Sequence, residues 1–78
     1  MKEKKLSFVV TYFTTAEAMA TERLCKALNI QGKLISAPRS VSADCGIAFA
    51  TAPENREILT SALQEKGIEV QGFHELFI

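Results

Sequence analysis

The chain has 78 residues and a mass of 8.6 kDa, which is enough for one small domain but not for a second core or a separate catalytic lobe. Hydrophobic residues make up 47% of it and charged residues 23%, a balance typical of a globular protein rather than a disordered tail. Nine basic residues offset nine acidic ones, so the chain lacks the charge excess of a nucleic-acid or anionic-membrane binder. We expect one domain over residues 1–78, with residues 1–5 flexible.

Two cysteines are too few for the disulfide framework of a small secreted domain, and they fit a reducing compartment. The Lys-rich start and the apolar run after it resemble a signal peptide, but Ser7 and Thr11 interrupt that run and Glu17 follows it. No apolar stretch approaches the roughly 20 residues that span a bilayer. We therefore expect a cytoplasmic protein without membrane association.

The first half of the chain predicts a strand, a helix and a second strand. Residues 6–13 alternate between two apolar faces, one of them Leu6, Phe8, Val10 and Tyr12, which favours a central strand. Thr14 and Glu17 form a capping box for a helix from about Thr15 to Leu28, with a buried stripe expected at Ala16, Ala20, Leu24, Ala27 and Leu28. Asn29 favours the left-handed turn that ends a helix, after which Ile30 packs back on the last turn. A strand over residues 32–37 then stops at Pro38.

The second half predicts the same order of elements. Residues 47–51 form a short apolar strand, and Pro53 opens a helix because the first turn needs no donor from its backbone nitrogen. That helix ends at Gly67, and its expected buried stripe is Ile58, Leu59, Ala62 and Leu63. A last strand is predicted from Ile68 to Phe77, with a bulge near Gly72 where the apolar alternation breaks.

The two halves resemble each other faintly. When the sequence is aligned with itself so that position 29 matches position 67, Asn29-Ile30 aligns with Gly67-Ile68. Two strand-helix-strand units side by side predict an α+β fold, the ferredoxin-like βαββαβ sandwich, with an antiparallel sheet and two helices on one face. That fold hosts many unrelated functions, so the function must be argued from a site.

The loop over residues 37–46 is longer than a tight hairpin needs, which favours a functional role. It holds a thiol at Cys45, a fixed cation at Arg39, hydroxyls at Ser40 and Ser42, and Gly46, whose backbone allows an anion to approach closely. A nearby guanidinium favours the reactive thiolate, whereas the adjacent Asp44 opposes it unless its carboxylate points away. These residues could together hold a thiolate or an anion.

This segment, Pro38-Arg39-Ser40-Val41-Ser42-Ala43-Asp44-Cys45-Gly46-Ile47, resembles the signature of the selenium/sulfur carrier protein-like family, formerly a domain of unknown function found in bacteria and archaea. The similarity extends from about Leu6 to Phe77. The family pattern is Pro-Arg, a serine-rich stretch and Cys-Gly, and here Ala43 and Asp44 replace further serines. The resemblance implies a carrier in which Cys45 holds sulfur or selenium as a persulfide or selenosulfide.

Cys45 is therefore the candidate catalytic nucleophile, and the candidate binding residues are Arg39, Ser40, Ser42 and Gly46. The alternative interpretation is that Cys45 only packs, as a small apolar residue at the start of a strand. We expect such a packing role for Cys25 in the first helix. His74 has no second ligand at a convincing spacing, so no metal site is predicted, and no cofactor motif occurs.

RNA binding has to be considered because RRM domains use the same sandwich. Residues 45–52 can be aligned with the RNP1 octamer, but an aliphatic residue occupies a stacking position and Cys45 replaces the leading basic residue. With zero net charge as well, we expect no nucleic-acid partner.

The leading hypothesis is a cysteine-dependent sulfur or selenium carrier or accessory protein. Such a chain needs a donor protein and an acceptor protein, and by itself it is not expected to be a complete enzyme. The rival hypothesis is a non-catalytic interaction or small-ligand-sensing module without a reactive cysteine. In either case a homo-oligomer formed through a sheet edge or an apolar face is compatible with so small a core.

Overall fold

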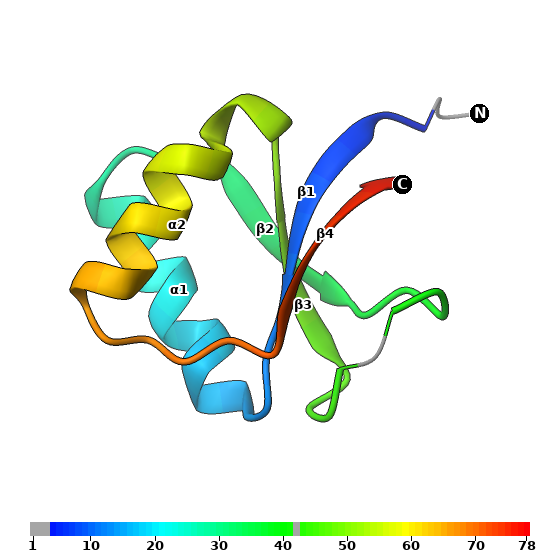
Figure 1. The fold of residues 1–78 in the computed structure, drawn as a ribbon, viewed down its shortest axis with the longest axis horizontal. Coiled ribbons are helices and arrows are strands. Elements are labelled where there is room, and N and C mark those ends of the chain that lie inside the picture. The colour runs from blue at the N-terminus through cyan, green and yellow to red at the C-terminus, as the bar shows by residue number, and fades with distance from the viewer. Residues whose placement is uncertain (1–3, 42) are drawn as a thin grey trace.

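The computed structural model describes residues 4–41 and 43–78, which form a two-layer α+β sandwich. The elements in chain order are β1 (Leu6–Thr11), α1 (Thr15–Ala27), β2 (Gly32–Ser36), β3 (Ile47–Thr51), the short 3-10 helix η1 (Pro53–Asn55), α2 (Arg56–Glu65) and β4 (Gly72–Phe77). The sheet order is β2-β3-β1-β4, and all three neighbouring pairs are antiparallel. Both helices cover one face of the sheet (Figure 1). The predicted ferredoxin-like fold and the central place of the first strand are confirmed.

The main core lies between the sheet and the helices. Alternate residues of β1 and the residue after it point toward the helices, and Phe8, Val10 and Tyr12 are each at most 1% exposed. They meet Phe49 of β3 and a buried set from the helices and turns: Ala18, Cys25, Ile30, Leu59 and Leu63. This burial supplies the main apolar stabilisation of the fold.

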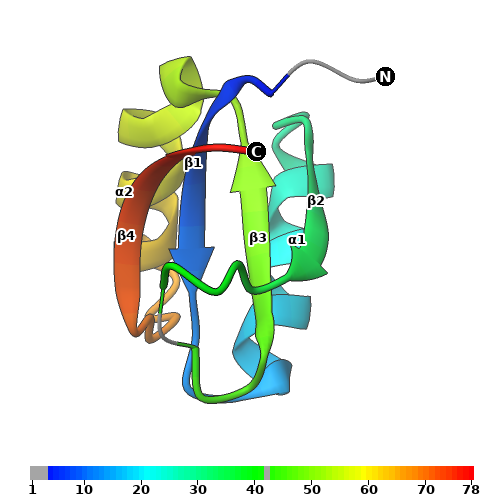
Figure 2. The same ribbon diagram turned by 90° about the vertical axis from the view of Figure 1, so that its right-hand side faces the viewer.

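A second, smaller apolar cluster covers the outer face of the sheet, where no helix packs. Val9 and Ala48 are fully buried and Ala50 nearly so, with Ile35, Ala37 and Leu76 packed against them. Figure 2 shows the loop between β2 and β3 running across this face in front of β3 toward β1. The long loop therefore covers part of the face that this sandwich would otherwise leave open.

Both helices end in the same way, as the internal similarity predicts. Asn29 and Gly67 have φ values of 59° and 68°, in the left-handed region that favours asparagine and glycine. The backbone N–H of Ile30 donates to the Cys25 carbonyl at 2.8 Å, and that of Ile68 donates to the Leu63 carbonyl at 3.0 Å. After each helix the chain thus reverses direction, and the same type of backbone hydrogen bond, from an N–H to the carbonyl five residues earlier, holds the turn.

The predicted buried stripes of the helices are partly wrong. In α1 the buried residues are Ala18, Thr21 and Cys25, whereas the predicted stripe at Ala16, Ala20, Leu24, Ala27 and Leu28 is exposed or only half-buried. In α2, Leu59 and Leu63 are buried as expected, but Ile58 is 57% exposed. Apolar residues occur on several sides of these short helices, so packing against the sheet, and not hydrophobicity alone, decides which side is buried.

The predicted last strand begins too early. β4 starts at Gly72 and pairs with β1 in regular register from Thr11↔Gly72 to Leu6↔Phe77, without the expected bulge among the paired residues. Ile68 and Val70 instead pack on the core from a segment outside the sheet. The flexible start is expected over residues 1–5, and residues 1–3 lie outside the described residues. Lys5 exchanges two backbone hydrogen bonds with Ile78, each 3.1 Å long.

None of the helices in the described part of the chain has the length and apolar character needed to cross a membrane.

Because Leu59 is buried and Ile58 is exposed on α2, truncating their side chains should destabilise the fold by different amounts. Leu59→Ala removes a side chain that is 0% exposed and should lower the free energy of unfolding by about 2–4 kcal/mol, because it leaves a cavity between helix and sheet. Ile58→Ala is the matched control and should cost less than about 1 kcal/mol. Urea unfolding followed by circular dichroism measures both values. Equal losses would contradict the observed orientation of α2.

The burial of the Cys25 thiol predicts that the fold loses stability at alkaline pH. Burial raises the pKa of its thiol from the ordinary 9.0 to about 11. Below pH 9 the thiol is protonated in the folded and the unfolded chain, so its contribution to stability is complete. Between pH 9 and pH 11 the unfolded chain releases this proton more readily than the folded chain, and the contribution is lost.

The free energy of unfolding should therefore fall between pH 9 and pH 11 by about 1–2 kcal/mol more in the wild type than in Cys25→Ala. Tyr12 has a raised pKa as well and adds to the loss in both proteins, so the difference between them reports the effect of Cys25, including its effect on the Tyr12 phenol. Urea unfolding at several pH values measures it, and parallel pH profiles for the two proteins would refute the assignment.

Candidate functional site

The loop between β2 and β3 consists of two tight turns that meet at a common neck. The backbone N–H of Ala37 donates to the Gly46 carbonyl at 2.9 Å and closes the neck. The first turn is held by Val41 N–H donating to the Pro38 carbonyl, and the second by Gly46 N–H donating to the Ala43 carbonyl. Gly46 has a φ of 76°, so the second turn requires the conformation that glycine adopts without strain. Each of the two turns therefore has a defined backbone shape.

Cys45 lies in the second turn with its side chain toward the helices. It is half-buried and packs against the main core cluster. Its Sγ donates a hydrogen bond to the Ile47 carbonyl at 3.3 Å. The side chain is therefore neither freely solvated at a loop tip nor sealed in the core.

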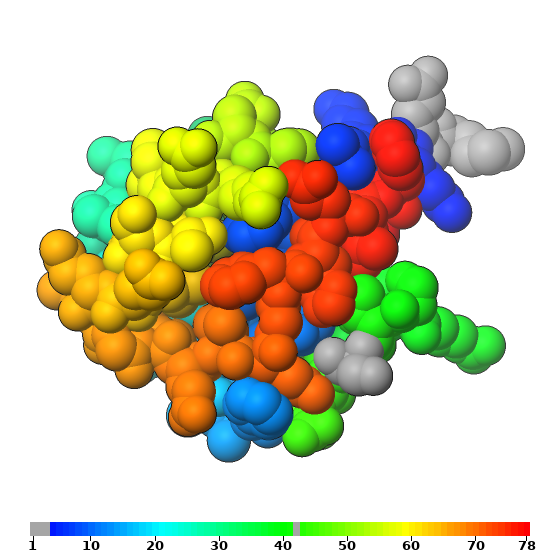
Figure 3. All heavy atoms as spheres, in the orientation of Figure 1, coloured from blue at the N-terminus to red at the C-terminus, as the bar shows by residue number. Residues whose placement is uncertain are grey.

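The second turn is fastened to the start of β4 through Gln71. The Gln71 side-chain Oε1 accepts a hydrogen bond from the Asp44 backbone N–H at 2.9 Å, and its Nε2 donates to Asp44 Oδ1 at 3.4 Å. The Gln71 backbone N–H in turn donates to the Thr11 carbonyl at 2.7 Å. In Figure 3 the surface of this turn (green) adjoins the chain entering β4 (orange). Gln71 thus positions the turn that carries Cys45 and gives the Asp44 carboxylate a partner other than the thiol.

Two of the remaining predicted site residues lie in the other turn of the loop. Arg39 and Ser40 belong to the first turn and are exposed. Among the described residues, no hydrogen bond joins the Arg39 guanidinium to the Cys45 sulfur. Ser42 lies outside the described residues. The structure therefore brings together Cys45 and Gly46 in one turn and places Arg39 and Ser40 in the other.

Tyr12 lies in the same core cluster and was not singled out by the sequence as a site residue. It is fully buried, and its hydroxyl has no hydrogen-bond partner within residues 4–41 and 43–78. Burial raises the pKa of this phenol beyond its ordinary range, and the Cys25 and Cys45 thiols raise it further, whereas the Thr21 hydroxyl lowers it. The phenol and the two cysteines of the chain therefore share one electrostatic environment between sheet and helices.

His74 lies on β4, paired with Val9 of β1, and its Nε2 is 3.5 Å from the Thr11 hydroxyl. No group of three or more His, Cys, Asp or Glu residues suited to a metal ion occurs among the described residues.

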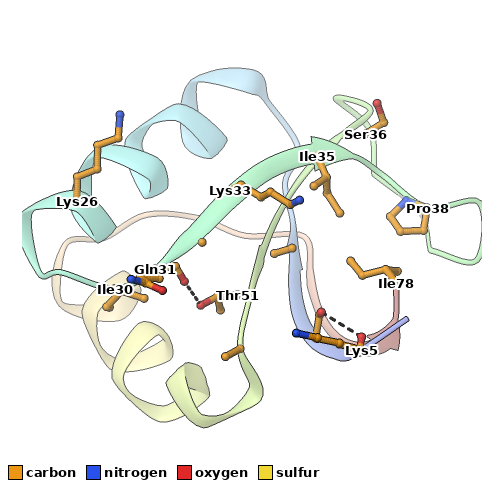
Figure 4. A pocket seen from close by; sticks show the side chains of 14 residues that line it. Lys5, Lys26, Ile30, Gln31, Lys33, Ile35, Ser36, Pro38, Thr51 and Ile78 are labelled. Atoms are coloured by element: carbon orange, nitrogen blue, oxygen red, sulfur yellow. Dashed lines mark hydrogen bonds between the residues drawn. The ribbon is translucent and has the colours of Figure 1, made fainter. Parts of the chain in front are cut away.

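An open groove of about 1190 Å³ runs from the end of α1 past β2 and β3 to the chain around Lys5 and Ile78. Figure 4 shows Ile35, Pro38 and Ile78 near one end of it, with Gln31 and Thr51 joined by a hydrogen bond at the other. The described residues that line it include Lys5, Lys26 and Lys33 and no acidic side chain. Pro38 belongs to the groove, whereas Cys45 does not line it.

Comparison with known proteins gives one match. A search of curated proteins and a search of solved structures each found no match. A protein-family model with the description "Putative Se/S carrier protein-like" matches residues 7–75, which is nearly the whole chain and includes both turns of the loop. The chain belongs to this Se/S carrier protein-like family.

Proposed function

We propose that the protein carries sulfur or selenium on Cys45 between a donor protein and an acceptor protein. The observation that carries the proposal is the position of Cys45 in a glycine-closed turn, half-buried and fastened by Gln71. Reactive thiols commonly occupy partly exposed, structured positions, and a carrier must hold its sulfur in a fixed place while shielding it from solvent. Membership of the Se/S carrier protein-like family supports the same function.

The loading step is a thiol exchange that needs no external oxidant. The Cys45 thiolate attacks the outer sulfur of a donor persulfide, forming a new S–S bond while the S–S bond of the donor breaks. The donor leaves as a thiolate, and Cys45 becomes a persulfide that keeps the proton of the transferred sulfur. Delivery repeats the exchange with a thiolate of the acceptor. A selenium atom follows the same sequence of bond changes as a selenosulfide.

The other predicted residues have separate parts in this proposal. Gly46 shapes the turn and, lacking a side chain, leaves room beside Cys45 for the reacting cysteine of a partner. In this proposal Arg39, Ser40 and Ser42 contact the partner, and in the complex Arg39 stabilises the anionic sulfur of the exchange. Because both ends of the transfer belong to other proteins, the chain is an accessory protein rather than a complete enzyme.

The second candidate is a non-catalytic interaction or ligand-sensing module. Two observations favour it: the Cys45 side chain packs against the core, and Cys45 does not line the groove with three lysines. In such a module Cys45 contributes apolar contact alone, and the loop serves to cover the outer face of the sheet.

Loading from a sulfur-donating enzyme distinguishes the two functions. After incubation with a cysteine desulfurase and cysteine, the wild-type protein should gain the mass of one sulfur atom on the peptide containing Cys45. Cys25→Ser should gain the same mass, because Cys25 is only 2% exposed, and Cys45→Ser should gain none. Replacing cysteine by selenocysteine in the same assay tests selenium. No added sulfur on the wild type, or equal labelling of Cys45→Ser, refutes the carrier and leaves the module.

A further inference from the structure

The Tyr12 hydroxyl is a buried polar group that the fold leaves without a partner. Tyr12 is 0% exposed, and its oxygen makes no hydrogen bond of standard geometry to a described residue, although the Thr21 hydroxyl is close enough to lower the pKa of the phenol. The neighbouring hydroxyl of Thr21 donates its own proton to the Glu17 carbonyl at 3.0 Å. Buried hydroxyls are nearly always hydrogen-bonded because an unpaired one loses its bonds to water without compensation. Such an exception calls for a partner that the resting chain does not supply.

The Tyr12 side chain and the Cys45 side chain pack on the same, helix-facing side of the sheet. β1 pairs with β3 up to Thr11↔Ala48, so continuing the pairing by one residue sets Tyr12 opposite Ile47. Cys45 lies in the turn just before β3 and packs against the helix-facing core cluster, the cluster that contains Tyr12. Both side chains contact the core cluster that also contains Cys25, and both thiols act electrostatically on the phenol.

The chemistry of the phenol fits a donor role. Burial keeps Tyr12 protonated because it raises the pKa of the hydroxyl, so this group offers a proton at neutral pH. A sulfur atom added to Cys45 is a terminal, readily ionised group about 2.05 Å beyond Sγ. An anion in partly apolar surroundings requires a hydrogen-bond donor. Loading also removes the Sγ proton, which ends the donation from Sγ to the Ile47 carbonyl and releases the side chain to rotate.

We infer that the Tyr12 hydroxyl donates a hydrogen bond to the sulfur or selenium atom carried on Cys45 and so forms its binding site. The inference rests on the proposed function, since it concerns the loaded state of the same cysteine. The contact makes and breaks no covalent bond. It holds the carried atom on the helix-facing side of the turn, where solvent thiols reach it slowly, until an acceptor withdraws it.

The test measures how long the loaded state survives. The full chain is loaded with inorganic polysulfide, freed of excess reagent and exposed to glutathione, and the persulfide on the Cys45 peptide is followed by mass spectrometry. Tyr12→Phe should shorten its lifetime by about tenfold, the fold-change for loss of one hydrogen bond to a charged group. Cys25→Ala is the matched control because it removes atoms from the same cluster without removing the donor, and it should leave the lifetime within about twofold.

Thermal unfolding gives an independent readout. Unloaded Tyr12→Phe should melt at or above the temperature of the wild type, because it loses a hydroxyl that has no partner. Loading should raise the melting temperature of the wild type and leave that of Tyr12→Phe unchanged. An unloaded Tyr12→Phe that fails to fold would mean that the hydroxyl already has a partner, and this would overturn the inference.

The outcomes separate this inference from the proposed function. Equal persulfide lifetimes in the wild type and Tyr12→Phe refute the role of Tyr12 even if Cys45 accepts sulfur from a desulfurase. A persulfide that Tyr12 protects after polysulfide loading, in a protein that takes no sulfur from a desulfurase, supports the contact and refutes the carrier. A Cys45 that accepts sulfur from neither reagent overturns both.

Discussion

The pairing of β1 with β3 is the constraint on which the site depends. Its register, Phe8↔Thr51 to Thr11↔Ala48, aligns the end of β1 with the start of β3 and fixes which side chains point toward the helices. A slip of one residue in β3 would exchange its two faces, because side chains alternate along a strand. Phe49 would then leave the main core, and Ala48 would face the helices in its place. Since Phe49 is 1% exposed in the main core, the core itself enforces the register that brings the end of β1 beside the start of β3, next to the turn that carries Cys45.

The two cysteines show how position gives one residue type two different environments. Cys25 is on the inner side of α1, where burial raises its pKa to about 11 and leaves it a weak nucleophile at neutral pH. Cys45 is in a turn that Gly46 shapes and Gln71 fastens, and its sulfur is half-buried at the edge of the same core. A carrier requires this difference, because a reactive second thiol beside a persulfide would displace the carried sulfur as sulfide and form a disulfide. The inertness of Cys25 thus supports the proposed role of Cys45.

Local signals in the sequence predict the order of elements well. Asn29 and Gly67 mark helix ends because few residues tolerate a left-handed backbone, and Pro53 marks the start of the second helical segment. The sides of the helices could not be read in the same way, as Ile58 shows, because tertiary packing selects among several apolar residues. The apolar alternation predicts Ile68 and Val70 in the last strand, but they pack on the core without joining the sheet.

The site was only partly predictable for the same reason. Cys45 and Gly46 are adjacent in the sequence, so the motif identifies them, and the family match covers both. Gln71 lies 27 residues from Asp44, and Tyr12 meets the cluster around Cys45 only through the strand register. No local pattern predicts such contacts. The placement of Arg39 and Cys45 in different turns likewise follows from the backbone hydrogen bonds of the loop.

The difference between the two thiols in the folded protein is the most direct test of this account. Iodoacetamide labelling of the unloaded native chain at neutral pH, resolved by peptide mass spectrometry, gives a separate rate for each cysteine. The account predicts that Cys45 is labelled in the native state, whereas Cys25 is labelled only as fast as the chain unfolds. Equal rates, or a Cys45 that is labelled no faster than global unfolding, would contradict a carrier that presents its sulfur from this turn.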